Sequence, residues 1–141
     1  MKAKFFSRYV DYPVISDDSG LSIKALKNQP GIFSARLAKK HGSFLNAMRF
    51  ILKKMKGQKN RKATFVCSLS YINNFGKIIS AEGKLKGNIS LKILGKKGFG
   101  YDPIFIPNKY KITFGQMLKS KKIKMDHRFL AFQKLKKKIK I

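Results

Sequence analysis

Residues 14–21 read Val14-Ile15-Ser16-Asp17-Asp18-Ser19-Gly20-Leu21, and the rest of the chain is interpreted outward from them. The β-branched pair at the start is typical of a strand, and the acids, hydroxyl and glycine that follow predict a tight turn at its end. Adjacent carboxylates are unusual in a chain with 33 basic and 6 acidic residues. They suggest a cation site beside a phosphate-rich ligand. A turn in which Asp17 or Asp18 caps its own backbone is the alternative.

Length and composition indicate one domain with its own core, since the chain has 141 residues of which 43% are hydrophobic. No apolar run reaches the roughly 18 residues that a membrane helix needs. The first ten residues lack the apolar segment and small-residue cleavage site of a secretory signal. A single cysteine, Cys67, excludes an internal disulfide and a cysteine-built zinc site, and we expect it to be a buried, inert thiol in a strand. The expected compartment is the cytoplasm.

A formal net charge of +27 is compatible with a polyanionic partner such as nucleic acid or a nucleotide. The basic residues, mostly lysine, are nevertheless spread along the whole chain, which is typical of a solvated surface. Only Lys134-Leu135-Lys136-Lys137-Lys138-Ile139-Lys140 forms a dense run. The composition therefore does not favour nucleic acid as a partner, and a basic nucleic-acid-binding module remains the alternative function.

Hydrophobic periodicity predicts one clear helix and one long hairpin. Apolar residues recur at helical spacing from Ser43 to Lys56, with Ser43 as the N-cap and Gly57 just past the end. Residues 61–72 and 78–89 read as strands joined by a turn at 73–76, which favours antiparallel pairing. The remaining expectations are a helix end within 2–10, short strands at 14–16 and 21–23, a turn at 28–31, a loop at 32–36, a strand at 104–107, a short helix at 113–118 and a helix or helical pair at 120–139.

Gly95-Lys96-Lys97-Gly98-Phe99-Gly100-Tyr101-Asp102-Pro103 forms an unusual loop with three glycines, two lysines, two aromatics and an acid. Exposed backbone donors in such a loop bind phosphate, and a ring between glycines offers a face for stacking on a base. An ordinary structural turn is equally compatible with the pattern. Farther along, Asp126-His127-Arg128 lies near the start of the predicted helical segment 120–139, and a lone His-Arg pair of this kind is usually an exposed surface feature.

Five stretches occur in one order that resembles a known family. They are Ser16-Asp17-Asp18-Ser19-Gly20-Leu21, Pro30-Gly31-Ile32-Phe33-Ser34-Ala35-Arg36, Arg61-Lys62-Ala63-Thr64-Phe65, Gly98-Phe99-Gly100-Tyr101-Asp102-Pro103-Ile104-Phe105 and Asp126-His127-Arg128. From about Lys2 to its end, the chain resembles the inosine triphosphatase, or Ham1-like, family of purine nucleoside triphosphate pyrophosphatases. The resemblance implies Mg²⁺-dependent hydrolysis of ITP, dITP or XTP to the monophosphate and pyrophosphate, in nucleotide-pool sanitation. It also implies a homodimer.

The resemblance assigns roles to individual residues. Asp18 matches the catalytic acid, which acts as general base on water and helps to hold the metal, and Asp17 matches a supporting position in the metal shell. Ser19 matches a substrate-contacting position. The loop that holds the base end of the nucleotide is matched by Phe99, Gly100, Tyr101 and Asp102. The positions that read the purine are matched by Lys122, His127 and Arg128.

The chain also departs from the family pattern. The family begins with a strand and a Thr-Gly-Asn phosphate-binding loop ending in Lys, then a helix and a metal-binding glutamate, none of which precedes Asp17 here. Asp126 stands where the family usually has serine. We therefore expect residues 1–141 to form one N-terminally truncated α/β domain, a mixed elongated sheet flanked by helices without the first strand–helix unit. Little activity of the chain alone is expected. A reading frame that starts upstream and a degenerate, catalytically dead homologue are both compatible with this.

Overall fold

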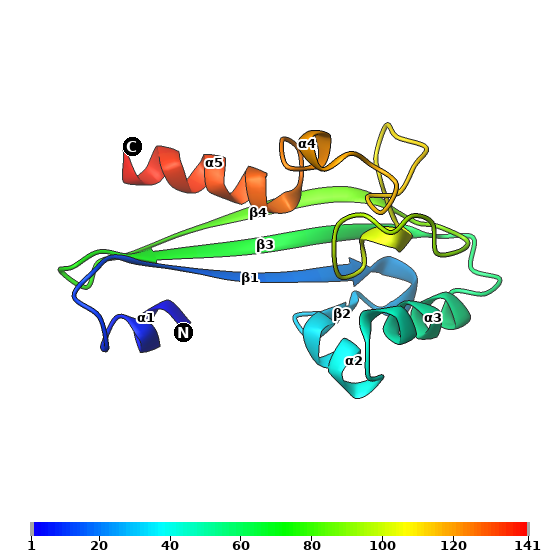
Figure 1. The fold of residues 1–141 in the computed structure, drawn as a ribbon, viewed down its shortest axis with the longest axis horizontal. Coiled ribbons are helices and arrows are strands. Elements are labelled where there is room, and N and C mark those ends of the chain that lie inside the picture. The colour runs from blue at the N-terminus through cyan, green and yellow to red at the C-terminus, as the bar shows by residue number, and fades with distance from the viewer. Residues whose placement is uncertain (1, 141) are drawn as a thin grey trace.

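The chain is built on an elongated antiparallel sheet with helices along its sides (Figure 1). This computed structural model describes residues 2–140, in which five strands are ordered β2-β1-β3-β4-β5. The strands are β1 (Val14–Ile23), β2 (Gln29–Gly31), β3 (Lys62–Ile72), β4 (Ile78–Ile89) and β5 (Phe105–Pro107). The helices are α1 (Lys2–Phe6), α2 (Ser34–Lys40), α3 (Phe44–Lys54), α4 (Lys119–Lys122) and α5 (His127–Ile139), with short 3₁₀ turns η1 (Lys24–Leu26) and η2 (Asp102–Ile104). The α/β class and the elongated sheet with flanking helices are as expected, and every strand pairing in these residues is antiparallel.

β1 corrects the prediction of a tight turn at Asp17 and Asp18. The strand is continuous over ten residues, and each of them from Val14 to Ile23 pairs with β3. Pairing along this whole length outweighs the local turn preference of the acids and the glycine. Because successive side chains of a strand point to opposite faces, Asp17 and Asp18 diverge. Gly20 fits here because a Cβ would collide with the carbonyl of Gly31 on β2.

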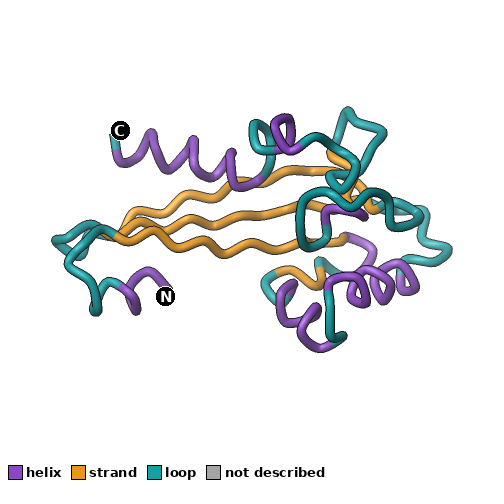
Figure 2. The backbone as a smooth tube through the Cα atoms, in the orientation of Figure 1, coloured by secondary structure: helices purple, strands orange, loops and turns teal. Residues whose placement is uncertain are grey.

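The hairpin of β3 and β4 confirms the strongest strand prediction and forms the centre of the sheet (Figure 2). On the outer side of β1, β2 pairs only with Leu21–Ile23. Within residues 2–140, the part of β1 from Val14 to Gly20 therefore has a strand neighbour only in β3. The two acids lie on this open length, so their backbone is at the edge of the sheet.

Two apolar clusters anchor the helices. α5 packs on β3 and β4 through Cys67, Leu69, Ala81, Ala131 and Leu135. Gly83 permits this close approach, since a Cβ there would meet the backbone of α5. The larger cluster includes Leu21, Ile51, Phe65, Phe105 and Phe114, and it joins α3 to β1, β3 and β5. Cys67 is fully buried as expected, and burial raises the pKa of its thiol.

α3 confirms the helix prediction, including Ser43, whose side chain accepts a hydrogen bond from the Asn46 N–H. The final helical pair is confirmed by α4 and α5, and the hairpin and the 104–107 strand agree within one residue. Two further predictions, both within residues 28–36, are wrong. Residues 32–36 are not a loop, because α2 begins at Ser34, and residues 28–31 contain the short strand β2.

Residues 113–118 form turns rather than the predicted helix. The Phe114 N–H donates to the Phe105 carbonyl, and the Gly115 N–H donates to the Asp102 carbonyl. The Thr113 hydroxyl donates to the Leu94 carbonyl. These hydrogen bonds tie the segment to β5 and to neighbouring loop residues, and it closes a single turn, in which the Met117 N–H donates to the Thr113 carbonyl. Among residues 2–140, no helix combines the length and apolarity that a bilayer crossing requires.

Candidate active site

A cavity of about 240 Å³ opens beside β1, between the glycine-rich loop, α2, α3 and the start of α5. All the site residues predicted from the sequence line this cavity except Lys122. Those that line it are Asp17, Asp18, Ser19, Phe99, Gly100, Tyr101, Asp102, His127 and Arg128. The fold therefore gathers three separate stretches of the sequence at one hollow.

Lys122 reaches the site through a buried ion pair with Asp102. Its Nζ lies 2.6 Å from Oδ2 of Asp102, and the two side chains are only 6% and 3% exposed. The same oxygen accepts the Phe99 N–H at 2.9 Å. Burial raises the pKa of Asp102, and the hydrogen bonds from Lys122 and from the Phe99 backbone counteract this. The pair fixes the loop because both charges are out of water and each needs the other.

Phe99 presents an exposed ring held by two cations. The Lys122 ammonium lies 4.6 Å from the ring centroid and the Arg128 guanidinium lies 4.7 Å from it. The residue is 59% exposed. The positive φ of Gly98 and Gly100 bends the loop around it, and a Cβ on Gly98 would collide with the Asp102 carboxylate. The ring is thus a stacking face on a rigid loop.

His127 is a buried, neutral imidazole. It stacks on Phe65 with centroids 4.7 Å apart and an interplanar angle of 11°. Burial and the charge of Arg128 lower the pKa of His127 to about 4. Its Nδ1 is shielded from solvent and has no hydrogen-bond partner among residues 2–140.

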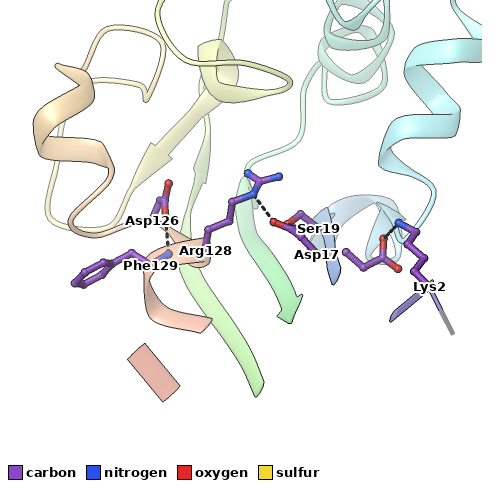
Figure 3. Close-up of polar contacts among 7 residues, drawn as sticks. Lys2, Asp17, Ser19, Asp126, Arg128 and Phe129 are labelled. Atoms are coloured by element: carbon purple, nitrogen blue, oxygen red, sulfur yellow. Dashed lines mark hydrogen bonds and ion pairs between the residues drawn. The ribbon is translucent and has the colours of Figure 1, made fainter. Parts of the chain in front are cut away.

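Asp17 is held on the α5 side of β1 (Figure 3). Its Oδ2 accepts Nε of Arg128 at 2.7 Å and its Oδ1 accepts the Ser19 hydroxyl at 2.8 Å. Burial alone would raise the pKa of Asp17, but these two hydrogen bonds and the Arg128 charge bring it below the usual value. Asp17 therefore orients Arg128 over Phe99 rather than sharing a ligand with Asp18.

Asp18 is the exposed carboxylate of the site. Its side chain is 66% exposed, and its Oδ1 lies 3.2 Å from Nζ of Lys2 in α1, whose side chain is 59% exposed (Figure 3). An exposed pair of this kind contributes little to stability, so the carboxylate is free to be recruited by a ligand. Lys2 was missed in the sequence because a lysine among many carries no local signal.

Asp126 has a structural role. It is the N-cap of α5 and accepts the Phe129 N–H at 2.8 Å. Serine is an equally good N-cap residue, which explains why aspartate fits where the family has serine. Sequence reasoning also gave no role to Ser34, Phe44 and Phe65, which line the cavity. The signal for Ser34 was its place in the matched stretch 30–36.

The metal prediction has only partial structural support. Asp17 and Asp18 side chains turn to different faces and bind different partners. Among residues 2–140, no three His, Cys, Asp or Glu side chains come together in a way that could hold a metal ion. Asp18 is thus available as a carboxylate ligand, whereas Asp17, bound to Arg128 and Ser19, points away from the shared metal shell predicted for it.

Together, the antiparallel sheet, the cavity beside β1 and the Phe99 ring next to two cations define an α/β protein with a pocket beside an exposed acid, Asp18. The family model described as the Ham1 family matches residues 1–138. The chain belongs to the Ham1 family.

Relatives agree in sequence and structure. The dITP/XTP pyrophosphatase of Clostridium tetani is 43% identical over 129 residues, and that of Dictyoglomus thermophilum is 44% identical over 140. The matches cover 92% and 96% of this chain but 64% and 67% of those relatives, so the chain spans about two thirds of their length. The Staphylococcus aureus Ham1 protein superposes with a TM-score of 0.91 at 34% identity, over 99% of this chain and 72% of that one.

Proposed function

We propose that this site hydrolyses the purine nucleoside triphosphates ITP, dITP and XTP to the monophosphate and pyrophosphate. One observation carries the proposal: a single cavity joins a base-sized stacking face, Phe99, to an exposed carboxylate, Asp18. The names of the relatives, dITP/XTP pyrophosphatases, support the substrate class. Removal of these nucleotides from the pool would be the cellular role.

Recognition of the base falls to the buried end of the cavity. The purine stacks on Phe99, as bases do on aromatic faces in general. Arg128, whose guanidinium lies beside that ring, donates to an acceptor such as the 6-keto oxygen of hypoxanthine or xanthine, while Lys122 holds the loop through its ion pair with Asp102. Adenine presents an amino group at the same place and meets only donors there, so it is rejected. His127 lies at the same end of the cavity, with its ring stacked on Phe65.

Bond cleavage falls to the exposed end. Asp18 takes a proton from a water molecule whose oxygen attacks the α-phosphorus, the bond from that phosphorus to the bridging oxygen breaks, and pyrophosphate leaves. Ser19 lies beside Asp18 on β1 and donates to a phosphate oxygen in place of its present bond to Asp17. Lys2 exchanges Asp18 for a phosphate oxygen and offsets the charge of the triphosphate.

Mg²⁺ belongs to the same proposal. Magnesium commonly uses one or two carboxylates plus substrate phosphates and water, so Asp18 fits as its protein ligand. When bound, the ion would neutralise charge on the phosphates as the pyrophosphate leaves. Asp17 orients Arg128 instead. A homodimer in the cytoplasm completes the proposal.

Nucleic-acid binding is the alternative that the charge raises. Part of the lysine run is already engaged, since Lys134 and Lys138 donate to the Glu82 and Ser80 carbonyls of β4. A nucleic-acid module predicts binding that falls steeply with salt and is indifferent to Asp18. The cavity and the acid favour the enzyme.

The test is pyrophosphate release from ITP, with and without Mg²⁺, by the chain and by Asp18→Asn. We expect Mg²⁺-dependent release that the substitution lowers by at least about a hundredfold. Asp11→Asn, an exposed acid away from the cavity, is the matched control and should leave the rate unchanged. Comparison of this rate with that of the longer Clostridium tetani relative measures how much of the activity resides in the part of the sequence that the two proteins share. Equal rates for the chain and Asp18→Asn would contradict the proposal.

A further inference from the structure

Ser34, the first residue of α2, contacts both halves of the site. Its Oγ accepts the Leu21 N–H at 2.9 Å and donates to the Gly31 carbonyl at 2.7 Å. Its own carbonyl accepts the Tyr101 hydroxyl at 2.6 Å. Leu21 lies three residues after Asp18 on β1, and Tyr101 lies two residues after Phe99 on the glycine-rich loop. One residue therefore ties the strand with the acid to the loop with the stacking ring.

The Tyr101 hydroxyl is committed to this contact. Tyr101 is 3% exposed and Ser34 is 6% exposed, so the hydrogen bond is shielded from water. Its ring meets Phe44 edge to face at 5.2 Å, which fixes the direction of the hydroxyl. Although Tyr101 lines the cavity, its single donor points at α2 and away from any ligand in the hollow.

We propose that Tyr101 is a positioning residue: its hydroxyl, held by the Ser34 carbonyl, sets the distance between the stacking loop and the strand that carries Asp18. The inference deepens the proposed function and rests on it for the identity of the ligand. It departs from the direct base contact implied by the resemblance for this position. Without the hydroxyl, the loop moves relative to β1, and the ligand must restore the geometry on binding.

The free energy needed to return the loop to its position against β1 is taken from the binding of the ligand. It does not affect the bound state, because the geometry of the complex is the same once it has formed. Tyr101→Phe removes only the hydroxyl and keeps the ring on Phe44. We expect the KM for ITP to rise about tenfold, the equivalent of one net hydrogen bond, with kcat within about twofold. A hydroxyl that served stability alone would lower the unfolding temperature and leave the KM unchanged.

Control variants distinguish loss of the Tyr101–Ser34 hydrogen bond from a general loss of stability. Tyr110→Phe removes a hydroxyl from a ring that packs under the Lys121 ammonium outside the cavity, and it should leave the KM unchanged. Ser34→Ala keeps the carbonyl that Tyr101 needs but leaves the Leu21 N–H unpaired, so it tests the β1 side of the tie. Ser34→Thr restores a hydroxyl and should recover the KM that Ser34→Ala loses.

A second measurement separates failure of this inference from failure of the proposed function. Amide hydrogen exchange needs no substrate, and Tyr101→Phe should speed exchange at Phe99 and Asp102 while the amides of the β3–β4 hairpin stay protected. If the chain neither binds nor hydrolyses ITP, the proposed function fails and the exchange decides the inference. Unchanged exchange in Tyr101→Phe, or an unchanged KM in an active chain, would overturn it.

Discussion

Two ion pairs of the site, Lys122–Asp102 and Lys2–Asp18, differ in almost every respect. Lys122 and Asp102 are buried, 2.6 Å apart, and surrounded by Phe99 and Phe114. Lys2 and Asp18 are mostly exposed and 3.2 Å apart at the open edge of β1. The first pair is part of the core, whereas the second is a loose contact on the surface. Under the proposed function, the contrast means that the end of the site assigned to base recognition is built before the ligand arrives, while the end assigned to bond cleavage is free to change partners.

The largest expected effect is a loss of stability when the buried Lys122–Asp102 pair is broken. Lys122→Met leaves the Asp102 carboxylate buried without its partner, which should lower the free energy of unfolding by about 3–5 kcal/mol. Lys2→Met removes an exposed contact and should change it by less than about 1 kcal/mol. Urea denaturation of both variants measures the difference. Equal losses in the two variants would remove the basis of the comparison.

pH tests the buried end in another way. Burial lowers the pKa of His127 to about 4 in the native chain. As the pH falls below about 6.5, the imidazole is therefore protonated in the unfolded chain while it is still neutral in the native chain. Stability from this group is complete above pH 6.5 and is lost as the pH falls to about 4, by about 3 kcal/mol in all. Burial raises the pKa of Asp102, which acts in the opposite sense at acid pH.

His127→Phe isolates the contribution of the imidazole because it keeps the ring on Phe65. Chemical denaturation at several pH values should show a shallower loss between pH 6.5 and 4 in this variant. The same slope in both proteins would show that His127 is protonated as easily in the native state as in the unfolded one.

Phe99 sharpens the comparison, because it belongs to the recognition end yet is exposed. Phe99→Ala should weaken binding of IMP by about 1–3 kcal/mol, the range for loss of one stacking face. Its effect on unfolding should be small, since the ring is 59% exposed. Calorimetric titration with IMP is the measurement, and Phe75→Ala in the hairpin turn, 95% exposed, is the control. Unaltered affinity would mean that the base does not lie on this ring.

The smallest effect concerns Asp126. As the N-cap of α5, it should be replaced by serine with a change of less than about 0.5 kcal/mol in unfolding free energy, whereas Asp126→Ala should cost about 1 kcal/mol. Thermal unfolding of the two variants is the check. A serine variant as unstable as the alanine variant would show that the charge, rather than the cap, matters.

The sequence predicts those parts of the molecule whose signals are local. The period-two and period-3.6 patterns of the hairpin and α3 depend on neighbouring residues, so their bounds are close to those observed. β1 was misread because its pairing with β3, about 50 residues away, overrides its turn residues. Likewise Arg128 binds Asp17 across 111 positions and Tyr101 binds Ser34 across 67, contacts that no local pattern reports.

The site residues themselves came from the ordered motifs, and the structure brings them together. Their division of labour came only from geometry, because adjacent acids in a strand face opposite ways. Asp17 thus binds Arg128, and Asp18 lies at the sheet edge with only an exposed contact to Lys2 among the described residues.

The most direct test of this division is the preference for ITP over ATP in binding, measured by calorimetric titration of the chain and of Asp18→Asn. If recognition resides in the buried end, both proteins bind ITP at least about tenfold more tightly than ATP, although Asp18→Asn no longer releases pyrophosphate. Loss of the preference in Asp18→Asn, or equal affinity of the unaltered chain for the two nucleotides, would contradict it.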